Sequence, residues 1–507
     1  MTSSEITSPR ERTFFGHPRG LATLFFTEFW ERFSYYGMRG ILILYLLDAI
    51  ETGGMGLTVA KAGAIYGMYT AGVYLLALPG GWIADRILGQ QRAVFTGGVI
   101  IAAGHFSMAI PSSFTFFAGL MLIVVGTGLL KPNVSAMVGD LYDVATWQVK
   151  ASDGGAHRDA GFTLFYMGIN VGAFVGPLVV GFLGENINWH LGFSAAGVGM
   201  VLGLVQYKMG LKYFGEAGRL AGRLRSEARD GVSQAKQRLL MGIGVTVGLV
   251  VVLALMQSMG AIALDLVRVA EGTGIFIVAL AALYFAYLLV LGGLTPAEKK
   301  RVVYIFILFL GAAMFWSGFE QAGSSLNLFA ERLTDRTVFG FEAPASWLQS
   351  VNPLFIIILA PVAASFWVWL GERNPSIPVK FGSGLALLGC GFFVIAWGAS
   401  FTGGGQLVSP AWLIVTYFFH TVGELALSPV GLSSVTKLSP RRLVVQMMGI
   451  WFMGTALGNL IAGLVAGRME TLPVEKIFST VGMVAVGAGL LLFVFSRPIK
   501  GLASDVK

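Results

Sequence analysis

The stretch Phe26–Gly40, FTEFWERFSYYGMRG, decides the fold because it places charges where a membrane span is expected. It forms the first half of a window, from about 21 to 48, that is otherwise apolar. Its charged residues are Glu28, Glu31, Arg32 and Arg39. Each charge at the centre of a membrane helix costs about 2.5–3.5 kcal/mol on insertion scales. Four such charges in one span therefore predict a functional site there.

The composition of the whole chain indicates an integral membrane protein. Of its 507 residues, 55% are hydrophobic and only 12% are charged, and the mean hydropathy is +0.74. A soluble globular protein has about twice that charged fraction. The 69 glycines and 38 phenylalanines suit closely packed membrane helices. A transmembrane barrel would show alternation with period two, which the sequence lacks.

Fourteen apolar windows are long enough to cross about 30 Å of hydrocarbon. They fall near 21–48, 60–84, 92–110, 114–138, 161–183, 192–210, 239–260, 273–294, 302–330, 347–370, 380–400, 409–435, 444–467 and 477–496. The chain is therefore predicted to be an all-α integral membrane protein with 14 transmembrane helices.

Lysine and arginine are distributed unevenly between the two sides of this map. The side that holds both termini carries 26 of the 35, the other side carries 6, and 3 lie inside spans. This asymmetry predicts that both termini are cytoplasmic. Anionic lipid at that face is sufficient to explain the net charge of +8, so no nucleic-acid partner is expected.

A basic, amphipathic stretch at 212–238 divides the windows into two sets of six, with an uncharged pair of spans after it. The predicted organisation is an N-terminal cytoplasmic tail (1–20), an N-terminal six-helix bundle (21–211), the basic linker (212–238), two extra transmembrane helices (239–294), a C-terminal six-helix bundle (295–496) and a cytoplasmic tail (497–507).

The charges of the first span share one side of a helix. Residues 28, 31, 32, 35 and 39 fall within an arc of about 100°. We expect this stripe, which includes Tyr35, to face the protein interior. A single ion pair could be a self-neutralised structural patch, but a whole stripe favours a path for a solute or proton.

Isolated charges in other spans complement the stripe. Lys131 lies in the fourth span, Glu320 in the ninth window and Glu424 in the twelfth. His420, Glu424 and Ser428 share a helix face at spacings of four. The first half is thus basic and the second acidic, which predicts a dipolar cavity for a zwitterion. Its carboxylate would face Arg32 and Lys131, and its ammonium would face Glu424. Aromatic residues, among them Tyr35, Tyr74 and Trp451, would line the walls.

The loop GGWIADRILGQQR, between the second and third spans, resembles the loop motif of the major facilitator superfamily. The matching residues are Gly81, Asp85, Arg86, Gly89 and Arg92. The glycine would let two helices meet, and the charges would hold their cytoplasmic ends together as a gating loop. The resemblance implies the fold of that superfamily, here two six-helix bundles with two additional linker helices.

The segment EFWERFSYYG is similar to the first-helix signature of the proton-dependent oligopeptide transporter family. GLLKPNVSAMVGDLY and FTLFYMGINVGAF resemble its fourth- and fifth-helix signatures, and FEQAGSSLN and GELALSPVGLS its later helices. The likeness runs from about residue 21 to 470. It implies a bacterial inner-membrane protein, a monomer and not an enzyme, that imports di- and tripeptides with protons.

The resemblance also implies roles for individual residues. Arg32 and Lys131 would hold the peptide carboxylate, and Asn170, Asn327 and Glu424 the amino end. Arg39 would be the partner of Glu320 near the outer gate. The residues assigned to proton coupling are Glu28, Glu31, Arg32, Arg39 and Glu320. Those assigned to the substrate are Arg32, Tyr35, Arg39, Tyr74, Lys131, Asn170, Asn327, Glu424, Ser428 and Trp451. The second span contains no histidine, so carboxylates would carry the titration.

The resulting hypothesis is proton-coupled symport by alternating access, with the proton as coupling ion and no metal or other cofactor. One alternative is a carrier of another small anion or zwitterion, such as nitrate or an amino-acid derivative, although Glu424 would repel an anion. A second is an intramembrane enzyme, but no His-Glu-x-x-His run or Walker loop is present. A third is a passive channel.

Overall fold

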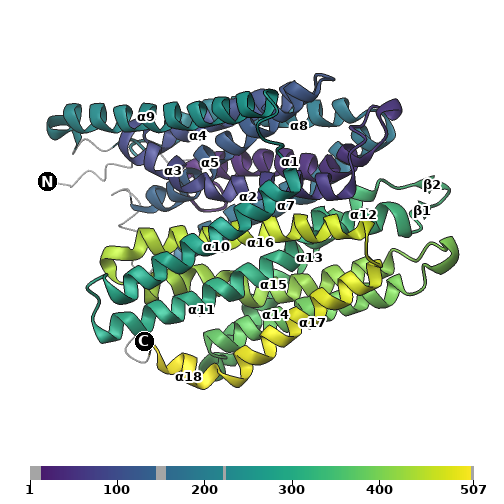
Figure 1. Ribbon diagram of the computed structural model, residues 1–507. Helices are drawn as coiled ribbons and strands as arrows, with labels where there is room; N and C mark the ends of the chain where they lie inside the picture. Colours follow the sequence, from purple (N-terminus) through teal and green to yellow (C-terminus); the bar gives the residue numbers. More distant parts are fainter. Residues whose placement is uncertain (1–12, 144–155, 221–223, 504–507) are drawn as a thin grey trace, which may run out of the picture.

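The structure is a computed structural model that describes residues 13–143, 156–220 and 224–503. The described chain is helical except for one short hairpin of two antiparallel strands, β1 (Thr337–Val338) and β2 (Phe341–Glu342). The long helices run roughly side by side, as Figure 1 shows.

The first part of the chain contains α1 (Arg19–Leu47), η1 (Ile50–Thr52), α2 (Val59–Leu75), α3 (Ala77–Ile83), η2 (Ala84–Leu88), α4 (Gln90–Met108), α5 (Ser113–Asp143), α7 (Ala156–Asn186), α8 (Trp189–Gly210) and η3 (Leu211–Tyr213). Two helices follow it, α9 (Leu224–Ser258) and α10 (Leu266–Val290). The last part contains α11 (Pro296–Phe319), η4 (Glu320–Gly323), α12 (Ser325–Leu333), η5 (Ala345–Ser350), α13 (Val351–Leu370), η6 (Gly371–Arg373), α14 (Ile377–Ala399), η7 (Gly403–Gly405), α15 (Ala411–Leu438), η8 (Arg441–Leu443), α16 (Val444–Gly467), η9 (Arg468–Glu470), α17 (Val474–Val494) and α18 (Ser496–Gly501).

All fourteen predicted spans are helical. Twelve helical segments of the described chain are long and apolar enough to cross a membrane. The other two predicted spans are α1, with its four charges, and α4, which contains Gln90, Arg92 and His105. Helix α1 is mostly buried and packs against α7 and α8, whereas α4 packs one face against α5 and α8 and exposes Val99 and Phe106. The predicted all-helical membrane fold is therefore confirmed.

The helices form two groups that meet along two seams. In the first group α1 packs on α7 and α8, and α4 on α5; in the second α11 packs on α16, and α14 on α15 and α17. The seams are α2 against α16, and α7 against η5 and α13. The largest cluster of buried apolar side chains contains residues of both groups, so the main core extends across the seams.

The two extra helices, α9 and α10, pack only partly against the rest of the protein. Helix α9 begins at Leu224, within the residues predicted as linker, and continues without interruption to Ser258. Helix α10 packs on α2, α11 and α16, and the hydroxyl of Tyr284 donates to Oε1 of Gln446 at 2.8 Å. The predicted domain boundaries stay a prediction, and residues 1–12, 144–155, 221–223 and 504–507 lie outside the described part.

The two ends of the bundle differ. Strands β1 and β2 lie at one end, and α18 lies at the opposite end (Figure 1). We call these the hairpin end and the terminal end. Helix α1 begins near η3 at the terminal end, so its later residues approach the hairpin end. There α1 contacts η4, α12 and η5 of the second group.

Candidate functional site

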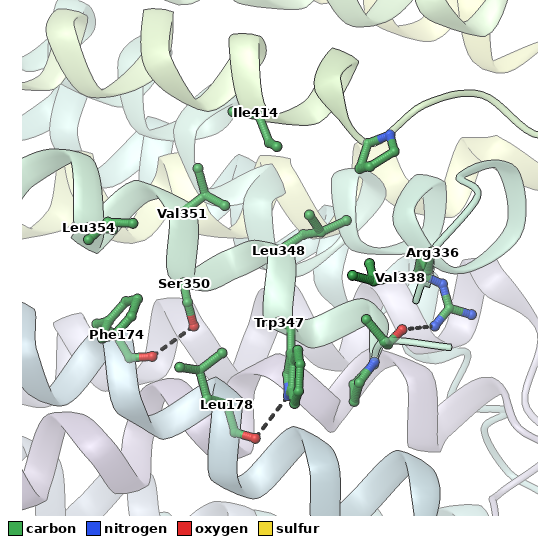
Figure 2. A pocket seen from close by; sticks show the side chains of 13 residues that line it. Phe174, Leu178, Arg336, Val338, Trp347, Leu348, Ser350, Val351, Leu354 and Ile414 are labelled. Carbon is green, nitrogen blue, oxygen red and sulfur yellow. Dashed lines mark hydrogen bonds between the residues drawn. The ribbon is translucent and has the colours of Figure 1, made fainter. Parts of the chain in front are cut away.

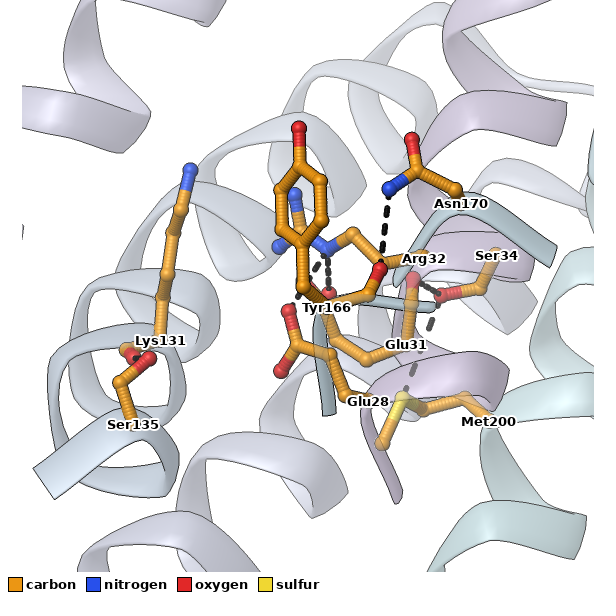
Figure 3. A network of polar contacts seen from close by, with 9 residues as sticks. All are labelled: Glu28, Glu31, Arg32, Ser34, Lys131, Ser135, Tyr166, Asn170 and Met200. Carbon is orange, nitrogen blue, oxygen red and sulfur yellow. Dashed lines mark hydrogen bonds and ion pairs between the residues drawn. The ribbon is translucent and has the colours of Figure 1, made fainter. Parts of the chain in front are cut away.

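Arg32 is clamped between two acids of its own helix, α1. Its Nε lies 3.2 Å from Oε1 of Glu28 and also donates to Oε2 of Glu31. The three residues are only 2%, 1% and 3% exposed, in the order Glu28, Glu31, Arg32. Tyr35 and Arg39 are also buried, so the whole predicted stripe faces the protein interior. Figure 3 shows the three residues of the clamp.

This cluster keeps unused bonding capacity. Oε2 of Glu28, Oε1 of Glu31 and Nη2 of Arg32 are buried without a hydrogen-bond partner among the described residues. Buried polar atoms in proteins are nearly always paired, and the exceptions need a reason. The two free carboxylate oxygens could each accept a proton. The free Nη2 of Arg32 could donate a hydrogen bond to an anionic group of a ligand.

Lys131 of α5 supplies a second positive charge. Its Nζ lies 4.2 Å from the centroid of the Tyr74 ring, which is a cation–π distance. The structure shows no ion pair between Lys131 and a described carboxylate. Figure 3 shows Lys131 across from the clamp, with its ammonium group joined to none of the three.

A second ion pair connects the two helix groups. Nη1 of Arg39 lies 2.6 Å from Oε2 of Glu320, and both residues are buried. Next to them the carbonyl of Gly40 accepts hydrogen bonds from Nδ2 of Asn327 at 2.8 Å and from Nε2 of Gln349 at 3.3 Å. These contacts hold α1 against η4, α12 and η5 on the hairpin side of the clamp.

Glu424 of α15 is the acidic pole of the second group. It is buried, and its Oε2 has no hydrogen-bond partner among the described residues. Asn352 of α13 lies beside it and donates to Oγ1 of Thr421 at 2.8 Å. Ser428, one turn further along α15, is half-buried.

Asn170 lies on α7, one turn after Tyr166. Its Nδ2 donates to the Tyr166 carbonyl at 2.9 Å, and its side chain is directed toward the Arg32 clamp (Figure 3). Asn170, which was assigned to the amino end of a peptide, therefore lies on the same side as Arg32, which was assigned to its carboxylate.

Tyr36 belongs to this site although the sequence did not single it out. Its ring centroid lies 5.8 Å from Cζ of Arg32 and 4.9 Å from Cζ of Arg39. It is more exposed than Tyr35, whose ring lies 5.1 Å from Cζ of Arg32. The spacing of four residues between Arg32 and Tyr36 was the signal that places both on one helix face.

Trp451 occupies a different environment from the charged residues. Its ring meets the Phe381 ring edge-on, with centroids 6.3 Å apart, and it lies against Gly431. Trp451 lies on α16 and packs against α14 and α15, and no ring contact with a described residue joins it to the clamp.

The predicted gating loop differs from expectation in two respects. The glycine that lets helices meet is Gly80, because an added Cβ there would lie 1.9 Å from the Gly128 carbonyl oxygen, whereas at Gly81 it would meet nothing within 4 Å. Asp85, Arg86 and Arg92 are exposed, and no ion pair of theirs with a described residue is present. Gly89 has φ +76°, a conformation that favours glycine, where the chain turns into α4.

A pocket of about 320 Å³ lies away from the clamp, along the seam of α7 with η5 and α13 (Figure 2). Its lining is almost entirely apolar, with side chains from α7, η5, α13 and the start of α15. Among the lining residues are Phe174, Leu178, Trp347, Leu348, Pro410 and Ile414. Arg336 is the one charged residue of this lining, so the pocket lacks the two poles of opposite charge that a zwitterion requires.

Buried ions of opposite sign at the seam of two helix groups define the class of protein. Ionisable side chains inside a membrane mark solute and ion pathways, and secondary transporters place such sites between their two halves. This chain is a multi-pass membrane transporter.

Comparison with known proteins gives the family. The model of the POT family matches residues 91–484, and the chain belongs to this family. The peptide transporter YePEPT of Yersinia enterocolitica is 41% identical over 99% of this chain and 98% of its own. A di-/tripeptide transporter of Lactococcus lactis subsp. cremoris is 38% identical, over 98% and 99%. The crystal structure of a peptide transporter POT in complex with sulfate matches with a TM-score of 0.87 and 43% identity, over 97% of both chains.

Proposed function

We propose that this chain is a proton-coupled symporter that imports di- and tripeptides by alternating access. One observation carries the proposal: Arg32 is held by two acids, whereas among the described residues Lys131 forms no ion pair with an acid and Oε2 of Glu424, on the other helix group, has no hydrogen-bond partner. The names of the two relatives above support peptides as the solute.

The clamp supplies the coupling. While Glu28 and Glu31 are ionised, their charges retain the Arg32 guanidinium. A proton on Glu31 removes one of the two ion pairs, and Nη2 of Arg32 has no hydrogen-bond partner in the part of the chain that the structure describes. Arg32 then binds the peptide carboxylate together with Lys131. Proton and peptide therefore stabilise the same state, which is thermodynamic linkage between two sites.

The amino end of the peptide would lie toward the second helix group. Oε2 of Glu424 and Oδ1 of Asn327 are buried acceptors without a partner among the described residues. The ammonium group of a peptide carries three N–H donors and could donate hydrogen bonds to both oxygens. Asn170 and the exposed ring of Tyr166 would contribute from α7, and Tyr35, Tyr36 and Tyr74 would line the space for side chains.

The orientation follows from the charges of the loops. With lysine and arginine concentrated at the terminal end, this end lies in the cytoplasm of a bacterial inner membrane and the hairpin end faces outward. The Arg39–Glu320 pair then belongs to the outer gate, which is closed in this conformation. Because a zwitterion has no net charge, the membrane potential, worth about 2.3 kcal/mol per charge per 100 mV, acts on the accompanying proton.

Reconstitution tests the proposal. Purified protein in proteoliposomes with an acidic exterior should accumulate radiolabelled dialanine above its external concentration, and a protonophore should abolish the accumulation. Equilibration without accumulation, unaffected by the protonophore, would indicate a channel. Accumulation of nitrate with no competition by dipeptides would indicate the anion carrier instead.

A further inference from the structure

One face of α7 is fastened to the start of η5 and α13 at the hairpin end. The fastening residues recur at spacings of four, three and four, which places them on a single face of the helix. They are Phe174, Leu178, Gly181 and Glu185. We call this set of contacts the α7 seam.

Two of these contacts use backbone carbonyls of α7. Oγ of Ser350 donates to the Phe174 carbonyl at 2.8 Å, and Nε1 of Trp347 donates to the Leu178 carbonyl at 2.9 Å. Both hydrogen bonds lie beside the apolar pocket and are drawn in Figure 2. Their donors are neutral, so each contributes a modest net amount.

Glu185 makes the third contact, and it is charged. Its Oε2 accepts from the backbone N–H of Ala345 at 2.6 Å, and its Oε1 accepts from the N–H of Ser346 at 3.1 Å. The first N–H groups of a helical segment have no partner within it, so a carboxylate from another helix completes them. Hydrogen bonds to a charged acceptor are about twice as strong as neutral ones.

The surrounding chain presents these N–H groups to Glu185. Arg336 bonds Oε1 of Glu342 at 2.8 Å and the carbonyl of Ala343, which fixes the chain just before η5. On the α7 side, Gly181 leaves no room for a side chain, because an added Cβ would lie 2.0 Å from Oγ of Ser346. The two surfaces are in direct contact.

We infer that Glu185 is a positioning residue of the transport cycle, which latches the hairpin end shut on the α7 side. It acts in addition to the Arg39–Glu320 pair, which closes the α1 side. The inference rests on the proposed alternating access, because opening the hairpin end must separate α7 from η5 and break both Glu185 bonds. Glu185 is partly exposed, so water can replace the lost partners.

Distances between spin labels test the latch directly. Labels at Ile187 and Leu407, both exposed, straddle the seam after replacement of Cys390, the only cysteine, by serine. Double electron–electron resonance on the reconstituted protein then gives the populations of short and long distances between the two labels. Glu185→Ala should raise the ratio of long to short about tenfold, as expected for charge-assisted bonds. Glu185→Gln should restore part of the short population, since its amide oxygen still accepts one N–H.

A second pair of variants avoids Glu185 itself. Gly181→Ala pushes a methyl group against Ser346 and should lengthen the same distance, whereas Gly487→Ala, where an added Cβ meets nothing within 4 Å, should not. Glu51→Ala removes an exposed acid outside the seam and should also leave the distance unchanged.

Kinetics separate a latch from simple damage. A larger outward-facing fraction lowers the apparent KM for external peptide. It also lowers kcat because reclosure is hindered. Poor folding would reduce kcat alone. Unchanged distances in both Glu185→Ala and Gly181→Ala overturn the latch, whether or not the wild type transports peptide. A wild type that carries no peptide, but whose distances shift as described, overturns the proposed function and leaves the latch standing.

Discussion

The guanidinium of Arg39 and the carboxylate of Glu320 meet at 2.6 Å and join α1 to η4 in a buried environment. Removing one partner of a buried pair leaves an uncompensated charge and costs about 3–5 kcal/mol. We therefore expect Arg39→Ala and Glu320→Ala each to lower the stability of the closed conformation strongly.

The double variant should be less destabilised than the sum of the two single ones, because neither charge is then stranded. Chemical denaturation of the four proteins in detergent measures this coupling. If the destabilisation of the double variant equalled the sum of the two single ones, the interaction between Arg39 and Glu320 would contribute nothing to stability.

Glu424→Gln tests the acidic pole. The variant retains hydrogen bonding but loses the charge that faces the peptide ammonium. It should weaken binding of a dipeptide with a free amine more than binding of its N-acetylated form. Competition against labelled dipeptide gives both affinities, and an equal loss for the two would remove the proposed role of Glu424.

Tyr36 should contribute through its ring, because the ring lies near both arginines. A cation–π contact is worth about 0.5–2 kcal/mol, so Tyr36→Leu should weaken peptide binding by roughly 2- to 30-fold. Tyr36→Phe keeps the ring and should weaken binding less. Tyr287→Leu, on the exposed surface of α10, is the control and should bind as wild type does.

Gly80 and Gly81 form a matched pair for stability. Gly80→Ala forces a methyl group into the Gly128 carbonyl and should cost about 1–3 kcal/mol, as overpacking usually does. Gly81→Ala has open space and should be nearly neutral. Thermal unfolding of the two variants decides which glycine makes the contact between α3 and α5.

The number of spans could be predicted because hydrocarbon thickness sets a length that apolar windows reveal. The breaks inside spans could not. The window 302–330 reads as continuous, yet α11 ends at Phe319 and η4 and α12 follow. A hydropathy profile does not reveal this interruption of the helix. Glu320, which pairs with Arg39, is the first residue of the interrupting segment η4.

The site was predictable where its members share one helix. Glu28, Glu31 and Arg32 fall together because helical spacing alone fixes their geometry. Contacts between helices depend on packing that one sequence does not reveal. The Glu185 carboxylate and the Ala345 N–H are 160 residues apart in the chain. No pattern in the sequence therefore singled out Glu185.

The central claim is that a proton on Glu31 frees Arg32 for the peptide. It is tested most directly by transport through Glu31→Gln in proteoliposomes, in two assays on the same preparation. Dipeptide accumulation driven by a pH gradient should be lost, while exchange of labelled for unlabelled dipeptide continues. A Glu31→Gln protein that still concentrates dipeptide against its gradient would contradict the claim.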